Sequence, residues 1–125
     1  LTLEQHQAWF QRYINKDDDF LFVIEFDEKL VGQASVYDIQ WNTGLAEIGR
    51  FLVAPESRGK GYIGAACAML INLCADKLCL RSLFLEVIEK NERAIHIYQQ
   101  NGFLEECSYN GLIRMGRSLA QIGKT

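Results

Sequence analysis

The chain has 125 residues, a mass of 14.3 kDa and a formal net charge of −3, and 49% of its residues are hydrophobic. This is the length of a single domain and the composition of an ordinary globular protein, which excludes a disordered chain. The acidic balance argues against a general nucleic-acid-binding protein. No apolar run approaches the roughly 18 residues of a membrane helix. We therefore expect neither nucleic acid nor a membrane as a partner.

The cysteines indicate a reducing compartment rather than a metal site. There are four of them, Cys67, Cys74, Cys79 and Cys107, and none forms a Cys-x-x-Cys pair. With only His6 and His96 to complete a ligand set, we expect no metal. The spacing of Cys67 and Cys74 places both on one face of a helix, where small buried thiols are common. Since we identify no signal peptide, the expected location is cytoplasmic.

The first half of the chain predicts one helix followed by three strands. The elements are a helix over 2–15, strands over 20–26 and 30–39 joined as a hairpin, and a strand over 45–53. The helix rests on a 3- and 4-residue spacing of Leu3, His6, Trp9, Phe10 and Tyr13. Strict alternation along the last strand would place Glu47, Gly49, Phe51 and Val53 on one face.

The second half of the chain predicts two helices and three more strands. The elements are a helix over 62–78, a strand over 81–88, a helix from 91 to 102, and strands over 103–108 and 112–119. Asn91 is a suitable helix cap, and Asn110-Gly111 is a strong hairpin turn. The order α-β-β-β-α-β-α-β-β predicts an α/β protein with a sheet of mixed strand direction.

A glycine-rich loop joins the strand over 45–53 to the helix over 62–78. The segment 58–64 reads Arg-Gly-Lys-Gly-Tyr-Ile-Gly, and such a loop presents backbone N–H groups and a helix N-terminus to an anion. It also fits the dinucleotide pattern G-x-G-x-x-G, with Glu86 placed 22 residues after Gly64. We reject that alternative because three strands precede the motif and residues 55–58 separate strand from glycine. The expected ligand group is a pyrophosphate.

Two motifs together resemble the GNAT acetyltransferases. Residues 47–61, Glu-Ile-Gly-Arg-Phe-Leu-Val-Ala-Pro-Glu-Ser-Arg-Gly-Lys-Gly, resemble the strand and loop of that family, whose loop pattern is [Q/R]-x-x-G-x-[G/A]. Asn91, thirty residues after Gly61, opens a segment that resembles the second motif, N-x-x-A-x-x-x-Y-x-x-x-G-F, and that ends at Phe103. The resemblance covers about residues 20–119.

The resemblance implies a mostly antiparallel sheet flanked by helices, with the parallel strands over 45–53 and 81–88 splayed apart around acetyl-CoA. The implied cofactor-binding residues are Phe51, Leu52, Val53, Arg58, Gly59, Lys60, Gly61, Ile63, Gly64, Asn91 and Tyr98. Ile63 departs from the family, which has Gly or Ala there, so contacts at 63 and 64 are shifted. The strand and helix that usually open the family are absent, so we expect a single, N-terminally incomplete domain over 1–125.

The resemblance also implies the catalytic groups of a direct acetyl transfer to an amine. Tyr98 matches the family's tyrosine acid, which protonates the departing thiolate. Two carboxylates match bases of different family members: Glu47 those of the histone-modifying enzymes, and Glu86 those of ribosomal-protein alanine acetyltransferases. Each lies on an apolar strand face, where desolvation raises the pKa of a carboxyl group toward a useful value. The choice between Glu47 and Glu86 stays open.

The acceptor is the least determined part of the prediction. The chain resembles two GNAT branches, one acting on amino-sugar nucleotides and one on protein N-termini, and we favour a small amine such as an amino-sugar nucleotide. A protein N-terminus, or a non-catalytic acyl-CoA-binding role, is the alternative. His96 is expected to be a surface or core histidine. The acidic run over 17–19 is expected to be a solvated turn, with attraction of a cationic acceptor as the alternative. By analogy with the family, the last hairpin offers an edge for a homodimer.

Overall fold

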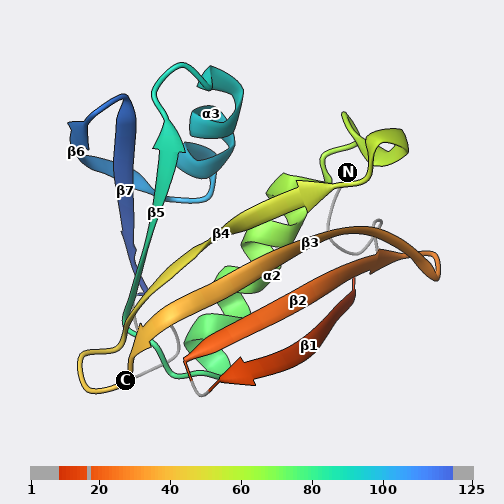
Figure 1. Cartoon of the computed structure of the whole chain (residues 1–125), viewed down its shortest axis with the longest axis horizontal. Helices are drawn as coiled ribbons and strands as arrows, with labels where there is room; N and C mark the ends of the chain where they lie inside the picture. Colours follow the sequence, from red (N-terminus) through yellow and green to blue (C-terminus); the bar gives the residue numbers. More distant parts are fainter. Residues whose placement is uncertain (1–8, 17, 120–125) are drawn as a thin grey trace.

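The computed structural model describes residues 9–16 and 18–119 of the chain, and in this part the strands form one seven-stranded sheet (Figure 1). The strand order is β1-β2-β3-β4-β5-β7-β6. The strands are β1 (Trp9–Lys16), β2 (Asp19–Phe26), β3 (Lys29–Gln40), β4 (Leu45–Val53), β5 (Ser82–Ile88), β6 (Leu104–Tyr109) and β7 (Leu112–Ser118). Only β4 and β5 pair in parallel within this sheet. The mixed, mostly antiparallel α/β fold is therefore confirmed.

The first strand corrects the sequence prediction. Residues 9–15, which we expected to end a helix over 2–15, belong instead to β1, which pairs antiparallel with β2 from Trp9 opposite Glu25 to Lys16 opposite Asp19. This segment is rich in aromatic residues, which suit a strand, and the neighbouring strand satisfies its backbone groups. The beginning of the predicted helix, residues 2–8, lies outside the described residues.

The tight turns follow the sequence prediction. Asn110 and Gly111 both have positive φ, 50° and 79°, which is the geometry of the two-residue turn that joins β6 to β7. Asp27 and Glu28 join β2 to β3 in the same way, with φ of 51° and 64°. Short acidic and amide side chains tolerate this left-handed backbone better than branched ones.

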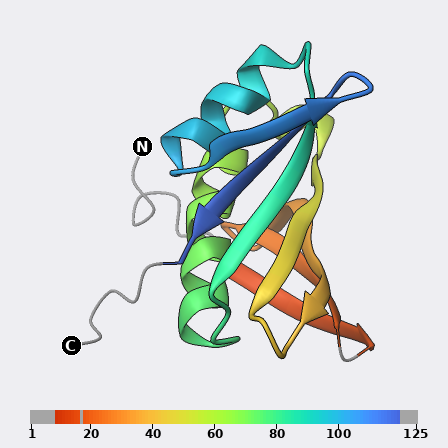
Figure 2. The same ribbon diagram turned by 90° about the vertical axis from the view of Figure 1, so that its left-hand side faces the viewer.

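Both helices lie on the same side of the sheet (Figure 2). They are α2 (Tyr62–Asp76) and α3 (Glu92–Gln100), and a short 3-10 turn, η1 (Pro55–Ser57), precedes α2. The buried residues of α2 recur at helical spacing, Tyr62, Ala66, Cys67, Leu70, Ile71 and Cys74. They form the core with the inward residues of the strands and with Tyr98 and Phe103. The other face of the sheet, from β3 to β7, is not covered by either helix, and we call it the open face.

The parallel strands β4 and β5 separate soon after they meet, as Figure 1 shows. Their pairing covers three residue pairs and ends where Glu47 lies opposite Phe84. Beyond this point β4 continues to Val53 beside β3, and β5 continues to Ile88 beside β7. The predicted splayed pair is therefore present, and we call the point of divergence the fork.

Candidate active site

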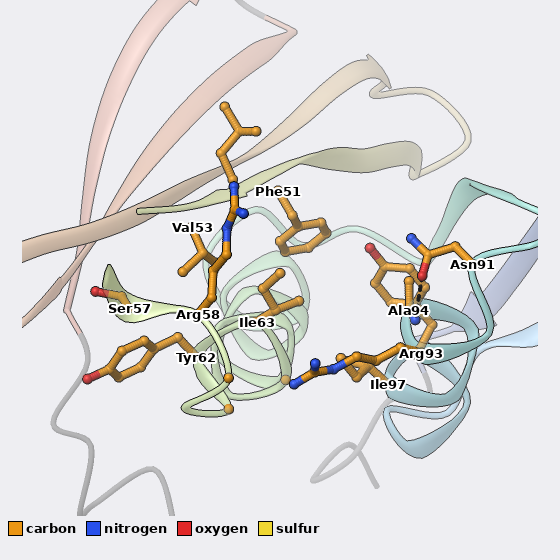
Figure 3. A pocket seen from close by; sticks show the side chains of 15 residues that line it. Phe51, Val53, Ser57, Arg58, Tyr62, Ile63, Asn91, Arg93, Ala94 and Ile97 are labelled. Carbon is orange, nitrogen blue, oxygen red and sulfur yellow. Dashed lines mark hydrogen bonds between the residues drawn. The ribbon is translucent and has the colours of Figure 1, made fainter. Parts of the chain in front are cut away.

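A pocket of about 400 Å³ lies where the end of β4, the glycine loop, the start of α2 and helix α3 meet (Figure 3). Its volume is in the range of small-molecule and cofactor sites. Its lining comprises Phe51, Leu52, Val53, Ser57, Arg58, Gly59, Gly61, Tyr62, Ile63, Gly64, Asn91, Arg93, Ala94, Ile97 and Tyr98. The structure thus brings together ten of the eleven residues assigned to the cofactor by the resemblance, and Lys60 is the one that does not line the pocket.

The glycine loop presents open backbone to the pocket. Gly59 and Gly61 have φ of 77° and 80°, and a Cβ added at either would meet nothing within 4 Å. Gly61 is the N-cap of α2 and supplies no side-chain hydrogen bond to the first turn of that helix. The N–H groups of that turn therefore remain available to a ligand, beside the positive end of the helix dipole. This arrangement suits an anion.

Two arginines add positive charge to the pocket. Arg58 comes from the loop and Arg93 from the first turn of α3, and Figure 3 shows both among the lining side chains. Sequence reasoning missed Arg93, together with Ser57, Tyr62, Ala94 and Ile97. The available signal was the position of Arg93 two residues after the helix cap Asn91, in the turn that faces the loop.

The start of α2 is held in place by contacts on both sides. The ring of Tyr62 packs against Phe26 of β2 with 5.4 Å between ring centroids. On the other side, a Cβ at Gly64 would lie 3.8 Å from Ile97 of α3, so the two helices approach closely there. Ile63 lines the pocket from this first turn. The departure at position 63 thus supplies an apolar wall.

Asn91 has the capping role that the sequence indicates. Its side-chain oxygen accepts a hydrogen bond of 3.1 Å from the N–H of Ala94 at the start of α3. Asn91 also lines the pocket, so the cap and a ligand contact are compatible. The helix ends with Asn101 as its C-cap, followed by Gly102 at φ 89°.

A β-bulge in β4 changes which face its residues occupy. Ser35 of β3 pairs with Gly49, but Gln33 pairs with Leu52, so β4 carries one extra residue, and Arg50 there has φ of 55°. Past the bulge, Phe51 packs on the core beneath the sheet. The expectation that Glu47 shares a face with Phe51 and Val53 is therefore wrong, because strict alternation fails at the bulge.

Tyr98 lies at the inner end of the pocket. It is 9% exposed, and its ring packs between Phe51, at 5.9 Å between centroids, and Phe103, at 6.3 Å. Burial, with a smaller contribution from Cys67, raises the pKa of Tyr98 to about 12. The phenol therefore keeps its proton at neutral pH and is able to donate it.

Glu47 and Glu86 lie on the open face of the sheet, and neither lines the pocket. Burial raises the pKa of the Glu47 carboxyl, a hydrogen bond from Tyr37 lowers it, and the nearby charge of Glu86 raises it. Glu86 is exposed and accepts a hydrogen bond from the hydroxyl of Tyr109. Glu47 is the last β4 residue before the fork, so the carboxylates and the pocket flank the point of divergence from opposite faces.

The remaining predictions on individual residues have mixed outcomes. His96 is exposed on α3. Asp19 is not part of a solvated turn, because it begins β2 and pairs with Arg50 at 3.4 Å, whereas Asp17 lies outside the described residues. All four cysteines are free, and Cys67 and Cys74 are buried on α2. Among residues 9–16 and 18–119 no group of three possible metal ligands comes together.

The pocket fits acetyl-CoA on its own features. Its lining offers open glycine backbone, an uncapped helix start and two arginines, which suit a pyrophosphate. It also offers the apolar side chains of Phe51, Val53 and Ile97 and the phenol of Tyr98. Beyond Glu47, no strand among the described residues pairs with the β4 edge that faces β5, so the backbone groups of that edge are available to the amide groups of an extended ligand arm.

Comparisons with known proteins agree with this geometry. Residues 2–103 match the model of the acetyltransferase (GNAT) family. Spermidine N(1)-acetyltransferase of Vibrio cholerae is 26% identical over 106 residues, which are 84% of this chain and 61% of the relative. The enzyme of the same name from Escherichia coli K12 is 31% identical over 97 residues, 78% of this chain and 52% of the relative. The putative ribosomal N-acetyltransferase YdaF of Bacillus subtilis is 35% identical over 81 residues, 65% of this chain and 44% of the relative.

Solved structures show the same fold. The crystal structure of spermidine N-acetyltransferase from Vibrio cholerae in complex with CoA and spermine has a TM-score of 0.79 at 23% identity, covering 98% of this chain and 74% of that one. The chain covers between 44% and 61% of the length of these three curated relatives. None of the helices described here is long and apolar enough to cross a membrane. With four-fifths of its length matched by the family model, the chain belongs to the GNAT acetyltransferase family.

Proposed function

We propose that the chain is the catalytic domain of an acetyl-CoA-dependent N-acetyltransferase that acts on a primary amine. The pocket carries this proposal, because the anion-binding loop and the buried phenol of Tyr98 both line it. When bound, acetyl-CoA supplies an acetyl group activated as a thioester. The first turn of α2, with Arg58 and Arg93, holds the pyrophosphate. Tyr98 holds at its Oη the proton that the departing sulfur requires.

We assign the base to Glu47 in preference to Glu86. An ammonium must lose a proton before its nitrogen attacks, and a base with a pKa closer to neutral is more effective. The pKa of the Glu47 carboxyl is raised by burial, and Glu47 lies directly at the fork. Glu86, exposed and beside Glu47, is placed to attract the cationic amine. The amine therefore approaches from the open face and acetyl-CoA from the helix side.

We propose a small cationic amine, such as a polyamine, as the acceptor. Glu47 has two other carboxylates close by, those of Glu86 and Asp38, so a positive charge is favoured there. Arg50 and Arg114 are already paired, with Asp19 and Glu106. The diphosphate of an amino-sugar nucleotide is negatively charged, so this acidic face attracts it less than it attracts a cationic amine. Two relatives of this chain are named spermidine acetyltransferases. A protein N-terminus is the second candidate, because the Bacillus subtilis relative is named a putative ribosomal N-acetyltransferase.

Ligand binding tests the pocket first. Saturation at 100 times the Kd should stabilise the protein by about 2.7 kcal/mol, which a thermal shift detects. We expect a shift with acetyl-CoA and CoA and none with NAD. An equal shift with NAD, or none with either CoA species, would contradict the assignment of the pocket.

A panel of amines then tests the reaction and the acceptor. It contains spermidine, an amino-sugar nucleotide and a peptide with the N-terminal sequence of a ribosomal protein, and CoA release is measured. We expect the highest kcat/KM with spermidine. If acetyl-CoA binds and no amine is acetylated, the non-catalytic acyl-CoA-binding role replaces the enzyme.

We propose a homodimer and a cytoplasmic location as the setting of this activity. Strand β6 forms the edge of the sheet, and all six of its residues are exposed. An exposed edge strand is a template for pairing with a second copy. Light scattering after size exclusion tests this, and a monomer at micromolar concentration would contradict it. The four free cysteines suit a reducing compartment.

A further inference from the structure

Tyr37 lies on the open face beside Glu47, outside the pocket and outside every residue assigned above to the reaction. We propose that Tyr37 is a positioning residue, whose hydroxyl holds the Glu47 carboxylate toward the fork while Arg50 and Asp19 hold Tyr37 itself. The proposal rests on the proposed function, in which Glu47 is the base.

The strand register brings the two side chains together. Tyr37 of β3 is the direct cross-strand partner of Glu47 of β4, so both side chains project from the same face at the same level. The hydroxyl of Tyr37 donates a hydrogen bond to the Glu47 carboxylate. A donated hydrogen bond fixes one orientation of the carboxylate and favours its ionised form. Both effects serve a group that must accept a proton at a defined place.

Arg50 covers the ring of Tyr37. Its guanidinium carbon lies 3.9 Å from the ring centroid, and its Nη1 lies 3.4 Å from the Oδ1 of Asp19. The guanidinium is therefore fixed from both sides, by a ring and by a carboxylate. Arg50 is the extra residue of the β4 bulge, with φ of 55°. The bulge at Arg50 therefore has two effects. It directs Phe51 into the pocket, and it places the Arg50 guanidinium over the ring of Tyr37.

The hydroxyl of Tyr37 occupies space that a side chain at position 49 would fill, and Gly49 leaves that space free. A Cβ at position 49 would lie 2.7 Å from the Oη of Tyr37, but 3.5 and 3.6 Å from the Cε1 and Cζ ring carbons. Only the hydroxyl is too close, whereas the ring would remain in ordinary contact. Gly49 shows no positive φ, so its backbone accepts alanine. A methyl group at 49 would therefore displace the hydroxyl specifically.

Other charges also act on Glu47 and must stay constant in a test. The pKa of its carboxyl is raised by Asp38 of β3 and Glu86 of β5, and lowered by Arg114 of β7. Burial of Glu47 is the largest influence and raises its pKa. Tyr37→Phe removes one hydroxyl and leaves all of these charges and the ring under Arg50 in place. The variant therefore isolates the hydrogen bond.

The decisive measurement is a carbon-13 NMR titration of the glutamate carboxyl groups of the full chain. The Glu47 signal is identified by its loss in Glu47→Gln. In Tyr37→Phe we expect the pKa of Glu47 to rise, because the hydrogen bond that favours the carboxylate is gone. The acid limb of kcat/KM should move to higher pH by the same amount, with the alkaline plateau kept and kcat/KM on the acid limb lowered roughly 3- to 10-fold.

Two further variants make the test specific. Tyr109→Phe removes the matching hydroxyl from Glu86 and should leave the Glu47 titration unshifted. Gly49→Ala should raise the pKa of Glu47 as Tyr37→Phe does, since it displaces the same hydroxyl. In the double variant, Gly49→Ala added to Tyr37→Phe should have no further effect, because the clashing atom is absent.

The results separate the positioning role from the proposed function. An unshifted Glu47 titration in Tyr37→Phe would overturn the positioning role, whether or not the enzyme is active. A rate lowered equally at all pH values, with a lower Tm, would also overturn it in favour of a structural role. A shifted titration in a protein that acetylates no amine would contradict the proposed function alone.

Discussion

The ring of Phe51 lies 5.9 Å from the ring of Tyr98, although Phe51 is four residues from Glu47 on the same strand and Glu47 faces the other side of the sheet. This relationship depends on the bulge at Arg50. One short stretch of β4 therefore contributes both to the wall of the pocket and to the acidic open face. The base and the acid that we propose approach the fork from these two sides.

The phenolic proton of Tyr98 is the first target for mutagenesis. Tyr98→Phe keeps the ring between Phe51 and Phe103 and removes only the hydroxyl. We expect kcat to fall by about 10²–10⁴-fold, with the Kd for CoA nearly unchanged. Steady-state kinetics and calorimetric titration with CoA measure the two effects. An unchanged kcat would remove Tyr98 from the acid role.

The glycine loop offers a substitution with a matched control. Gly61→Val places a branched side chain at φ 80° beside the open backbone of the pocket, so we expect CoA binding to weaken at least about tenfold. Gly111→Val makes the same change at φ 79° in the β6–β7 turn, which does not line the pocket, and should cost stability without loss of binding. Equal Kd values for the two variants would contradict the loop assignment.

The raised pKa of Glu47 predicts a pH-dependent penalty on stability. A carboxyl group whose pKa is higher in the folded state stabilises the fold below its unfolded pKa, and this stability is lost as pH rises through the folded value. Glutamine carries no titratable charge, so Glu47→Gln does not lose this stability as pH rises. The Tm of the variant should therefore increase relative to the Tm of the native protein between about pH 4 and pH 7. Thermal melts across that range measure it. A constant Tm difference would mean that burial does not act on the Glu47 charge.

The four thiols should divide into two classes. Burial raises the pKa of both Cys67 and Cys74 to about 12, so they are neutral and inaccessible in the folded protein. Cys79 and Cys107 are exposed. A thiol reagent at neutral pH should therefore label two cysteines in the native protein and four after unfolding. Rapid labelling of all four in the native state would show that α2 does not pack as described.

Local signals in the sequence predicted much of this fold correctly. The cap at Asn91 and the Asn110-Gly111 turn each depend only on residues close by in the sequence, and each is found where expected. The glycine loop likewise predicted its own position before α2. Residues 9–15 were predicted wrongly because their pairing with β2 outweighed a local periodicity.

The features of the site that were missed depend on register between strands. The extra residue at Arg50 is not visible in β4 alone, because it is defined by Ser35 and Gln33 on β3. The pairing of Tyr37 with Glu47 depends on the same register. Sequence alone therefore identified Glu47 as a candidate but could not give its neighbours, the face it occupies or the reason to prefer it to Glu86.

The bulge in β4 has a consequence for engineering the proposed activity. Under that proposal, substitutions before the bulge, at Glu47 or Gly49, should alter the acceptor side, whereas substitutions after it, at Phe51 or Val53, should alter the acyl-donor side. Preference for the amine and for the acyl chain should thus evolve separately along a single strand. Deleting one residue at the bulge would instead exchange the two faces and disrupt both specificities at once.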